Sequence, residues 1–391
     1  MKVTLSPSFA PIKADGTAVQ GMSLLSDEGP TIVLGWRDGD LVAPSTPSAS
    51  ILFGPRGGVR LSDGSLWIAD TGHHRLLGWN SGPDIDNQPA DLLIGQPDFA
   101  QEGRNAKGEI SAATLNVPTG VSSWGKGLAV ADAWNHRVLL WRERPTANNQ
   151  PADIILGQAN ASSGLANHGA SAPSNSSLHW PYGVAEINDR LVVCDTGNRR
   201  VMIWNDPAQT GQPADIVLGQ NSFTCRDENA GQGVSAVGMR WPHMAVLWKG
   251  GLAVADAGNN RIMAWDGMPT NNGQPCDIVL GQKNFTDCDH NQAHYYPQAA
   301  ALNMPYGIAV NGDKLLVADT ASSRIIGWQD KVTGSEASYL AGQPDFASKG
   351  DNRWGVAERD TLCWPYGITC SGDELVIADS GNNRVLLWKV A

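Results

Sequence analysis

The sequence contains few charged residues, few cysteines and no long apolar segment. Charged residues make up 17% of its 391 positions, and the formal net charge of −11 has the wrong sign for a surface that binds nucleic acid. No apolar run reaches the roughly 18 residues that a membrane-spanning helix requires, so we expect no membrane partner. The first residues lack the apolar centre of a signal peptide. The six cysteines therefore favour reduced thiols and a cytoplasmic location.

Common catalytic motifs are also missing. The chain has no Gly-x-Ser-x-Gly nucleophile elbow, no glycine-rich phosphate loop and no Cys-x-x-Cys pair. These absences remove the usual signs of a serine hydrolase, a nucleotide-binding fold and a thiol redox protein. We therefore predict no cofactor from this part of the analysis.

What the sequence does contain is one motif, Val-Ala-Asp-x-x-x-x-Arg-x-x-x-Trp or a near copy, repeated six times. Successive aspartates lie 60 to 63 residues apart, and a fixed period of this length indicates one structural unit copied six times. The aspartates are Asp70, Asp132, Asp195, Asp256, Asp319 and Asp379. The arginines are Arg75, Arg137, Arg200, Arg261, Arg324 and Arg384, and the tryptophans are Trp79, Trp141, Trp204, Trp265, Trp328 and Trp388.

Each unit holds four short runs rich in Val, Ile and Leu. In the third unit these runs are 183–185, 191–194, 200–204 and 215–218, and Gly, Pro, Asn and Asp separate them. Runs this short, with this punctuation, are typical of strands rather than helices. Four antiparallel strands in each of six repeats predict an all-β fold, a six-bladed β-propeller that forms a single domain over residues 1–391.

The last unit lacks a fourth strand, because the chain stops at Ala391, shortly after Trp388. Residues 31–35, Thr-Ile-Val-Leu-Gly, match the fourth strand of the other units and precede the first unit. We therefore predict that 31–35 is the outer strand of blade six and closes the ring, which removes an exposed sheet edge. Residues 1–30 show no repeat and are predicted to form an irregular N-terminal arm.

The repeats resemble a known family. The segments Val-Ala-Asp-Ala-Gly-Asn-Asn-Arg-Ile at 254–262 and Ile-Ala-Asp-Ser-Gly-Asn-Asn-Arg-Val at 377–385 are similar to the signature of NHL repeats. The resemblance covers all six units, from about residue 50 onwards, and implies a six-bladed propeller. It implies no single activity, because NHL-like propellers include protein-binding modules, RNA-binding modules, sensor domains and a few lyases.

Strand order predicts that most variable features share one face of the propeller. The connection from the outermost strand to the next innermost strand and the turn between the two middle strands emerge on the same face. Those connections span about 22 residues each, from a Gly-Gln pair to a Pro-x-Gly, whereas ordinary connections need ~4–6 residues. Long loops on a rigid scaffold are common binding elements. We therefore expect this long-loop face to bind the ligand or partner.

The repeated aspartates, arginines and tryptophans are interpreted as architecture. A reaction site needs asymmetry, and these residues recur in every unit. Asp accepts backbone N–H groups in turns, and Arg pairs with carboxylates. The tryptophans are expected to fill space between blades, with partners for their N–H groups. Replacement of Arg261 or Arg384 by alanine is expected to lower stability by roughly 1–3 kcal/mol.

The residues that break the symmetry form the candidate site. The middle residue of Pro-x-Gly starts the innermost strand and reads Arg56, Thr119, Tyr182, His243, Tyr306 and Tyr366 around the ring. Trp180, Trp241 and Trp364 precede three of the prolines. Aromatic walls with one histidine and one arginine suit a small ligand with an anionic group and an apolar part. His243 and Arg56 are also the candidate catalytic residues. The competing interpretation is that the aromatic residues plug the channel.

A metal site is the weaker hypothesis. The peptidyl-hydroxyglycine lyase of this propeller class is similar in layout, with zinc-binding histidines at Pro-His-Gly-like strand starts, but here only Pro242-His243 matches. The densest alternative set of ligands for a divalent metal is Asp287, Cys288, Asp289, His290 and His294. Cys225 and Cys288 occupy similar places in adjacent loops, as a thiol pair, as metal ligands or by coincidence.

Two functions follow from these features. The first is a recognition or scaffold propeller that binds a protein partner or a small anionic or aromatic ligand on the long-loop face. The second is a lyase or hydrolase that acts at the channel mouth, with or without a metal ion. The missing nucleophile and metal motifs favour the first function.

Overall fold

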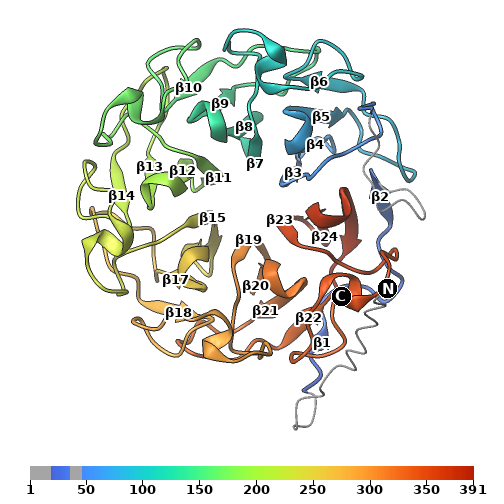
Figure 1. Cartoon of the computed structure of the whole chain (residues 1–391), viewed down its shortest axis with the longest axis vertical. Coiled ribbons are helices and arrows are strands. Elements are labelled where there is room, and N and C mark those ends of the chain that lie inside the picture. Colours follow the sequence, from blue (N-terminus) through green and yellow to red (C-terminus); the bar gives the residue numbers. More distant parts are fainter. Residues whose placement is uncertain (1–18, 36–45) are drawn as a thin grey trace, which may run out of the picture.

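Six blades, each built on four antiparallel strands, surround a central channel in the computed structural model, which describes residues 19–35 and 46–391 (Figure 1). The predicted six-bladed propeller is therefore confirmed. Blades one to three consist of β3 (Gly57–Arg60), β4 (Leu66–Asp70), β5 (Arg75–Trp79), β6 (Leu92–Ile94); β7 (Pro118–Trp124), β8 (Gly127–Asp132), β9 (Arg137–Trp141), β10 (Ile154–Leu156); and β11 (Pro181–Ile187), β12 (Arg190–Asp195), β13 (Arg200–Trp204), β14 (Ile216–Leu218). Blades four to six consist of β15 (Pro242–Trp248), β16 (Gly251–Asp256), β17 (Arg261–Ala264), β18 (Ile278–Leu280); β19 (Pro305–Asn311), β20 (Lys314–Asp319), β21 (Arg324–Trp328), β22 (Tyr339–Ala341); and β23 (Pro365–Ser371), β24 (Glu374–Asp379), β25 (Arg384–Lys389), β2 (Ile32–Leu34).

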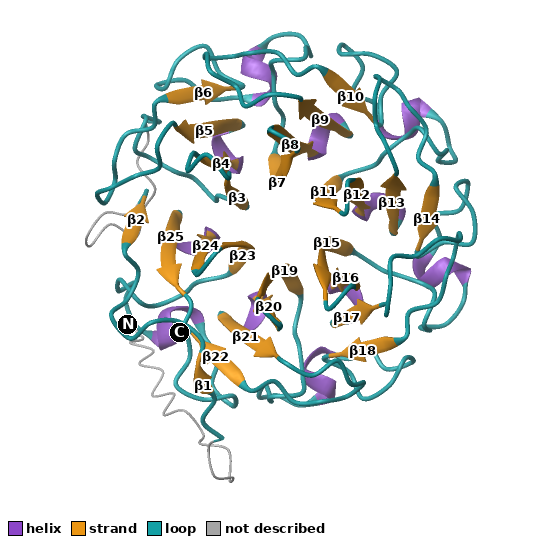
Figure 2. Cartoon of the chain, turned by 180° about the vertical axis from the view of Figure 1, so that it is seen from behind, coloured by secondary structure: helices purple, strands orange, loops and turns teal. Residues whose placement is uncertain are grey.

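The only helices in the described part of the chain are short 3₁₀ turns, and none there is long enough to cross a bilayer. One set lies between the two middle strands of each blade: η1 (Thr71–His73), η3 (Ala133–Asn135), η5 (Thr196–Asn198), η7 (Ala257–Asn259), η9 (Thr320–Ser322) and η11 (Ser380–Asn382). The other set lies in the long loops: η2 (Arg104–Lys107), η4 (Ala166–Gly169), η6 (Glu228–Gly231), η8 (His290–Ala293) and η10 (Asp351–Trp354). Figure 2 shows the ring from behind.

The ring is closed by the N-terminal segment, as predicted. Strand β2 pairs with β25 in antiparallel register, so that Ile32 faces Leu387 and Leu34 faces Val385. Apolar side chains on both strands are buried, which explains why the pairing is specific: a one-residue slip would turn them to the other face.

The predicted irregular arm is wrong in one respect. Residues 1–18 lie outside the described part, but Met22–Ser23 forms strand β1, which pairs in parallel with β22 at the outer edge of blade five. Leu25 then bridges to Val390, and the backbone oxygen of Ser26 accepts the indole N–H of Trp388 at 2.8 Å. The segment 19–34 thus links the outer edges of two blades before it completes the ring.

The repeated motif is architecture, as predicted. In blade two, Oδ2 of Asp132 accepts a 2.7 Å hydrogen bond from Nε of Arg137, and Oδ1 accepts the backbone N–H of Asn116. The Arg137 guanidinium also donates to the carbonyl oxygens of Ser111, Thr114 and Ala161 in the two loops that flank the blade. Both charged side chains are fully buried. Each such pair therefore fastens the long loops to the sheets.

The tryptophans of the third strands are buried between blades, as predicted, and their N–H groups have partners. The indoles of Trp79 and Trp141 donate to the carbonyl oxygens of Gln88 and Gln150 at 3.0 Å. Those glutamines lie in the turn that leads to the fourth strand, so each indole also fixes the outer edge of its own blade.

Candidate functional site

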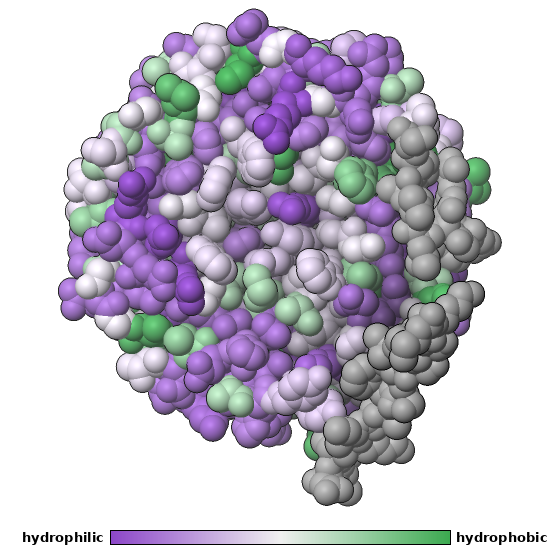
Figure 3. Space-filling model, viewed as in Figure 1, coloured by the Kyte–Doolittle hydropathy of each residue, from purple (hydrophilic) through white to green (hydrophobic). Residues whose placement is uncertain are grey.

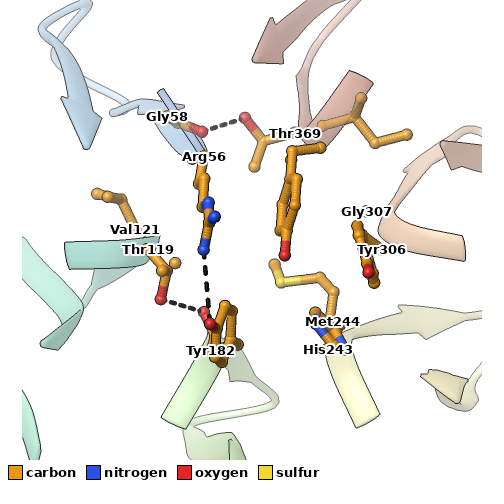
Figure 4. Close-up of a pocket in the computed structure, with 15 residues that line it drawn as sticks. Arg56, Gly58, Thr119, Val121, Tyr182, His243, Met244, Tyr306, Gly307 and Thr369 are labelled. Atoms are coloured by element: carbon orange, nitrogen blue, oxygen red, sulfur yellow. Dashed lines mark hydrogen bonds between the residues drawn. The ribbon is translucent and has the colours of Figure 1, made fainter. Parts of the chain in front are cut away.

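The residues expected at the channel mouth all line one cavity on the propeller axis (Figure 4). Each of them directly follows a proline at the start of an innermost strand or, in blade one, just before it. They are Arg56, Thr119, Tyr182, His243, Tyr306 and Tyr366. The structure therefore brings these six residues together, although they come from six different blades. Trp180, Trp241 and Trp364, the other members of the predicted set, do not line this cavity.

Glycine lets these innermost strands approach closely. A Cβ on Gly183 would lie 2.1 Å from the carbonyl oxygen of His243 on the next blade, which is too close for any side chain. The corresponding glycine of blade four is replaced by Met244, whose side chain lines the cavity. In the described ring, blade four is thus the only blade whose innermost strand has a side chain, rather than glycine, at the second position after the proline.

The aromatic side chains stack on one another. The His243 and Tyr306 rings are stacked, with centroids 4.3 Å apart, and the Tyr306 and Tyr366 centroids are also 4.3 Å apart. The Arg56 guanidinium carbon lies 4.8 Å from the Tyr366 ring centroid and 5.8 Å from that of Tyr182. These contacts continue around most of the channel wall, so the side chains hold one another in place.

The space that this ring encloses is small. Its volume of about 30 Å³ has room for one or two water molecules. A ligand with an apolar or aromatic part does not fit beside His243 unless the stacked rings move apart. The expected small-molecule site at this ring therefore stays a prediction, and the plugged channel is the arrangement that the structure contains.

His243 is uncharged at neutral pH. Its ring is buried, and desolvation lowers its pKa to about 4, with a further contribution from the positive charge of Arg56. Its Nδ1 lies 2.9 Å from the carbonyl oxygen of Trp241, and only a protonated Nδ1 can donate there. The neutral ring therefore carries its proton on Nδ1, and Nε2 is the free lone pair.

The junction between blades three and four departs from the others. In blade two, His136 Nδ1 accepts the backbone N–H of Trp180, and at the next but one junction Asn260 Oδ1 accepts that of Met304. The equivalent residue of blade three is Arg199, which has no acceptor atom. The N–H of Trp241 is instead 3.3 Å from Asp256, within its own blade. Trp241 also lacks the left-handed backbone that Trp180 adopts at φ 49°.

An open groove of about 450 Å³ lies beside this irregular junction, over blades four and five. Its lining includes Arg240, Trp241, Asn260, His290, Asn303 and Met304. The guanidinium of Arg240 covers the Trp241 ring at 5.0 Å from the centroid and pairs with Glu228 at 3.2 Å. The groove therefore offers an aromatic wall with a cation above it.

Three tryptophans form an apolar rim outside the stacked ring. Trp180, Trp241 and Trp364 are 43%, 39% and 56% exposed. They directly precede the prolines of blades three, four and six, so they are spread around the propeller axis. The face in Figure 3 has a pale, weakly polar centre, and more hydrophilic residues surround it. The three indoles are therefore partly accessible to solvent.

The sequence pointed to the tryptophans but missed the groove. No motif marks Arg240, Asn260 or Asn303 as site residues, because Asn260 belongs to the repeated turn and the other two lie two positions before a proline, outside the repeated motif. That position reads Phe53, Asn116, His179, Arg240, Asn303 and Cys363. The variation at this position between blades is the feature of the sequence that could have indicated the groove.

The candidate metal ligands do not converge. No group of three or more His, Cys, Asp and Glu side chains suited to a metal occurs within residues 19–35 and 46–391. The Asp287 carboxylate accepts a hydrogen bond from Asn284, and the Cys288 and Asp289 carbonyl oxygens accept the amides of Asn260 and Gln282. Desolvation raises the pKa of the Cys288 thiol, which disfavours the thiolate that metals bind. From this set only His290 reaches the groove; His294 does not line it.

All six cysteines are free thiols, so Cys225 and Cys288 form no disulfide. Cys225 lies 3.2 Å from the Ser222 hydroxyl. This leaves no covalent role for the pair in the structure.

The long loops are held rigidly on their inner side. Asn105 in the first loop and Asn135 in the following blade exchange two amide hydrogen bonds, of 3.2 and 2.7 Å. Gln96, from a Gly-Gln pair, donates to the carbonyl oxygens of His74 and Gly103. The loops are therefore parts of the scaffold on this side, and only their outer surfaces and the groove between them are available to a ligand.

The fold and the rim together define a closed six-bladed propeller with a blocked channel and an aromatic face. No known protein-family model matches the chain, and no curated protein is detectably similar to it. The similarity to NHL repeats thus rests on the motifs alone.

Solved structures with related topology share little sequence with the chain. A protein of unknown function from Bacteroides thetaiotaomicron is 16% identical, over 97% of this chain and 78% of its own, with a TM-score of 0.49. Virginiamycin B lyase from Staphylococcus aureus is 12% identical over 92% and 98% of the two chains, with a TM-score of 0.44, and the WD40 propeller domain of Doa1 is 9% identical over 92% and 96%, with a TM-score of 0.48. Similarity at this level says nothing about activity.

Proposed function

We propose that this protein is a recognition propeller that binds its ligand on the long-loop face, with the groove over blades four and five as the main contact. The open groove of about 450 Å³ carries the proposal, because it combines the Trp241 wall with the Arg240 cation. A ligand with a flat apolar group and an anionic group matches this lining. It is either a small molecule or a side chain presented by a protein partner.

The rim supports a site larger than the groove. Trp180 and Trp364 extend the aromatic surface beyond Trp241, and large half-exposed aromatic residues contribute most of the binding energy at many interfaces. The free thiols are consistent with the cytoplasmic location that we propose for the protein.

A lyase or hydrolase at the channel mouth receives less support. Such an enzyme needs room for a substrate beside its acid or base, and the cavity beside His243 holds about 30 Å³. Binding in the groove needs no rearrangement of the ring.

Three matched probes test the proposed function by ligand-observed NMR: 2-naphthoate, 2-naphthamide and octanoate. We expect 2-naphthoate to bind more tightly than the other two. Trp241→Ala should weaken that binding at least about tenfold, as loss of an aromatic contact does, and Arg240→Met should abolish the preference for the acid over the amide. Trp354→Ala is the matched control, because Trp354 is 75% exposed but does not line the groove. Equal binding of 2-naphthoate to wild type and to Trp241→Ala would show that the groove is not the site.

A further inference from the structure

The guanidinium of Arg56 lines the channel cavity without a carboxylate partner among the described residues, unlike the arginines of the repeated motif. The six motif arginines each pair with an aspartate, and Arg60 pairs with Glu374 at 2.6 Å. Arg56 forms no ion pair in the part of the chain that the structure describes. Its one hydrogen bond goes to the Tyr182 hydroxyl at 3.5 Å, the long limit for such a bond.

The surroundings of Arg56 contain no negative charge. No carboxylate lines the cavity, and the wall beside the guanidinium consists of tyrosine rings, backbone and the Thr119 side chain. Cation–π contacts with Tyr366 and Tyr182 compensate the charge only in part. A guanidinium has five N–H donors, so most of the Arg56 donors have no acceptor in the protein.

The available room limits what can supply the missing charge. The cavity of about 30 Å³ accepts an atom or group close to a water molecule in size. Tyr182, Tyr306 and Tyr366 line the same cavity. The Tyr306 and Tyr366 hydroxyls share one hydrogen bond, and the remaining phenolic O–H groups are further donors. Donors on several sides, one cation and no nearby carboxylate are the requirements of a small-anion site.

We propose that Arg56 and the tyrosines of the channel ring bind one small monovalent anion of the halide class. The anion sits inside the ring, accepts N–H groups of Arg56 and phenolic O–H groups, and neutralises the guanidinium. This site is distinct from the groove, so it stands or falls independently of the proposed ligand. The net charge of −11 repels anions at long range, and at physiological ionic strength a Debye length of about 8 Å confines that repulsion to short distances.

Bound anion stabilises the folded state, because the site does not exist in the unfolded chain. Replacing sodium gluconate by sodium chloride at constant ionic strength should therefore raise the melting temperature of the wild-type protein, by roughly 2–5 °C at saturation. Gluconate is too large for the cavity. Arg56→Met should abolish the rise and Arg56→Lys should keep part of it, whereas Arg144→Met, which removes a cation that lines neither the cavity nor the groove, should leave it unchanged.

Bromide locates the anion directly. Crystals grown in sodium bromide should give an anomalous peak within hydrogen-bonding distance of the Arg56 guanidinium, and Arg56→Lys crystals should show a weaker one. The bromide measurement on the wild type and on Arg56→Lys can be made even if Arg56→Met does not fold. The proposal is overturned if bromide peaks occur only elsewhere, or if chloride stabilises Arg56→Met as much as it stabilises the wild type.

Discussion

The Asp256–Arg261 pair of blade four allows a quantitative test of the scaffold. Both side chains are fully buried, with 3.0 Å between Arg261 Nε and Asp256 Oδ2. The arginine also donates to the carbonyl oxygens of Phe285 and Gly238 at 2.9 and 2.7 Å. Arg261→Met removes the cation, leaves a buried carboxylate without its partner and leaves two loop carbonyls without a donor.

The expected loss of unfolding free energy is therefore about 3–5 kcal/mol, the range for removal of one member of a buried ion pair. This loss exceeds the roughly 1–3 kcal/mol expected from the sequence. That lower figure included the lost hydrogen bonds but not the cost of a buried carboxylate that has lost its cation. The double variant Asp256→Asn/Arg261→Met removes both charges of the pair, so no unpaired charge remains buried. The double variant should thus lose clearly less than the sum of the two single variants.

Urea unfolding followed by circular dichroism measures these differences. Arg144→Met is the matched control: its ion pair with Asp63 is 2.8 Å long but partly exposed, so its loss should cost less than about 1 kcal/mol. The reasoning is refuted if Arg261→Met unfolds within about 1 kcal/mol of the wild type, or if the single losses simply add. Binding of 2-naphthoate should change little in Arg144→Met, because Arg144 does not line the groove.

Three further predictions concern closure, the ring and pH. Deletion of residues 1–35 removes β2 and β1, exposes the edges of β25 and β22, and should cause aggregation and loss of cooperative melting; a monomeric truncation with unchanged melting would contradict the closure. Gly183→Ala should destabilise strongly, because its Cβ meets the His243 carbonyl oxygen at 2.1 Å, whereas Met244→Gly, which restores the residue of the other blades, should fold, as thermal melting of both will show. Because the folded pKa of His243 is about 4, below the ordinary 6.5, the unfolded chain takes up this proton first and stability falls as the pH drops from 6.5 to about 4. In His243→Phe, this fall in unfolding free energy should be smaller by up to about 3 kcal/mol. Equal pH profiles of unfolding in both proteins would contradict the assignment of His243 as a buried, neutral side chain.

The repeat determined most of the fold because each of its residues has the same local role in every blade. Asp132 ends a second strand and Arg137 begins a third, as the motif predicted. The closing strand was predicted at 31–35 and spans Ile32–Leu34. Strand β1 was not predictable, because two residues carry no alternation and the pairing comes entirely from the free edge of β22.

The candidate site was predicted only in part. The spacing placed His243 and Arg56 on one ring, and the structure puts both on one cavity. The volume of that cavity depends on how the side chains stack. The spacing of the repeated motifs in the sequence does not predict this stacking. The groove lies beside the junction at Arg199, where an arginine occupies a position that accepts a hydrogen bond in other blades. An amino-acid substitution of this kind is visible in the sequence, but its effect on the next blade is not.

The pairing of β2 with β25 also has a consequence in time. Thr31 bonds to Leu387, a residue 356 positions later in the chain. A ribosome that adds ~5–20 residues per second needs roughly 20–70 s to cover that distance. During this interval the apolar residues of β2 are already made but have no partner strand. The segment that finishes the ring is thus synthesised long before the strand with which it pairs, and it can take its place only after that strand is made.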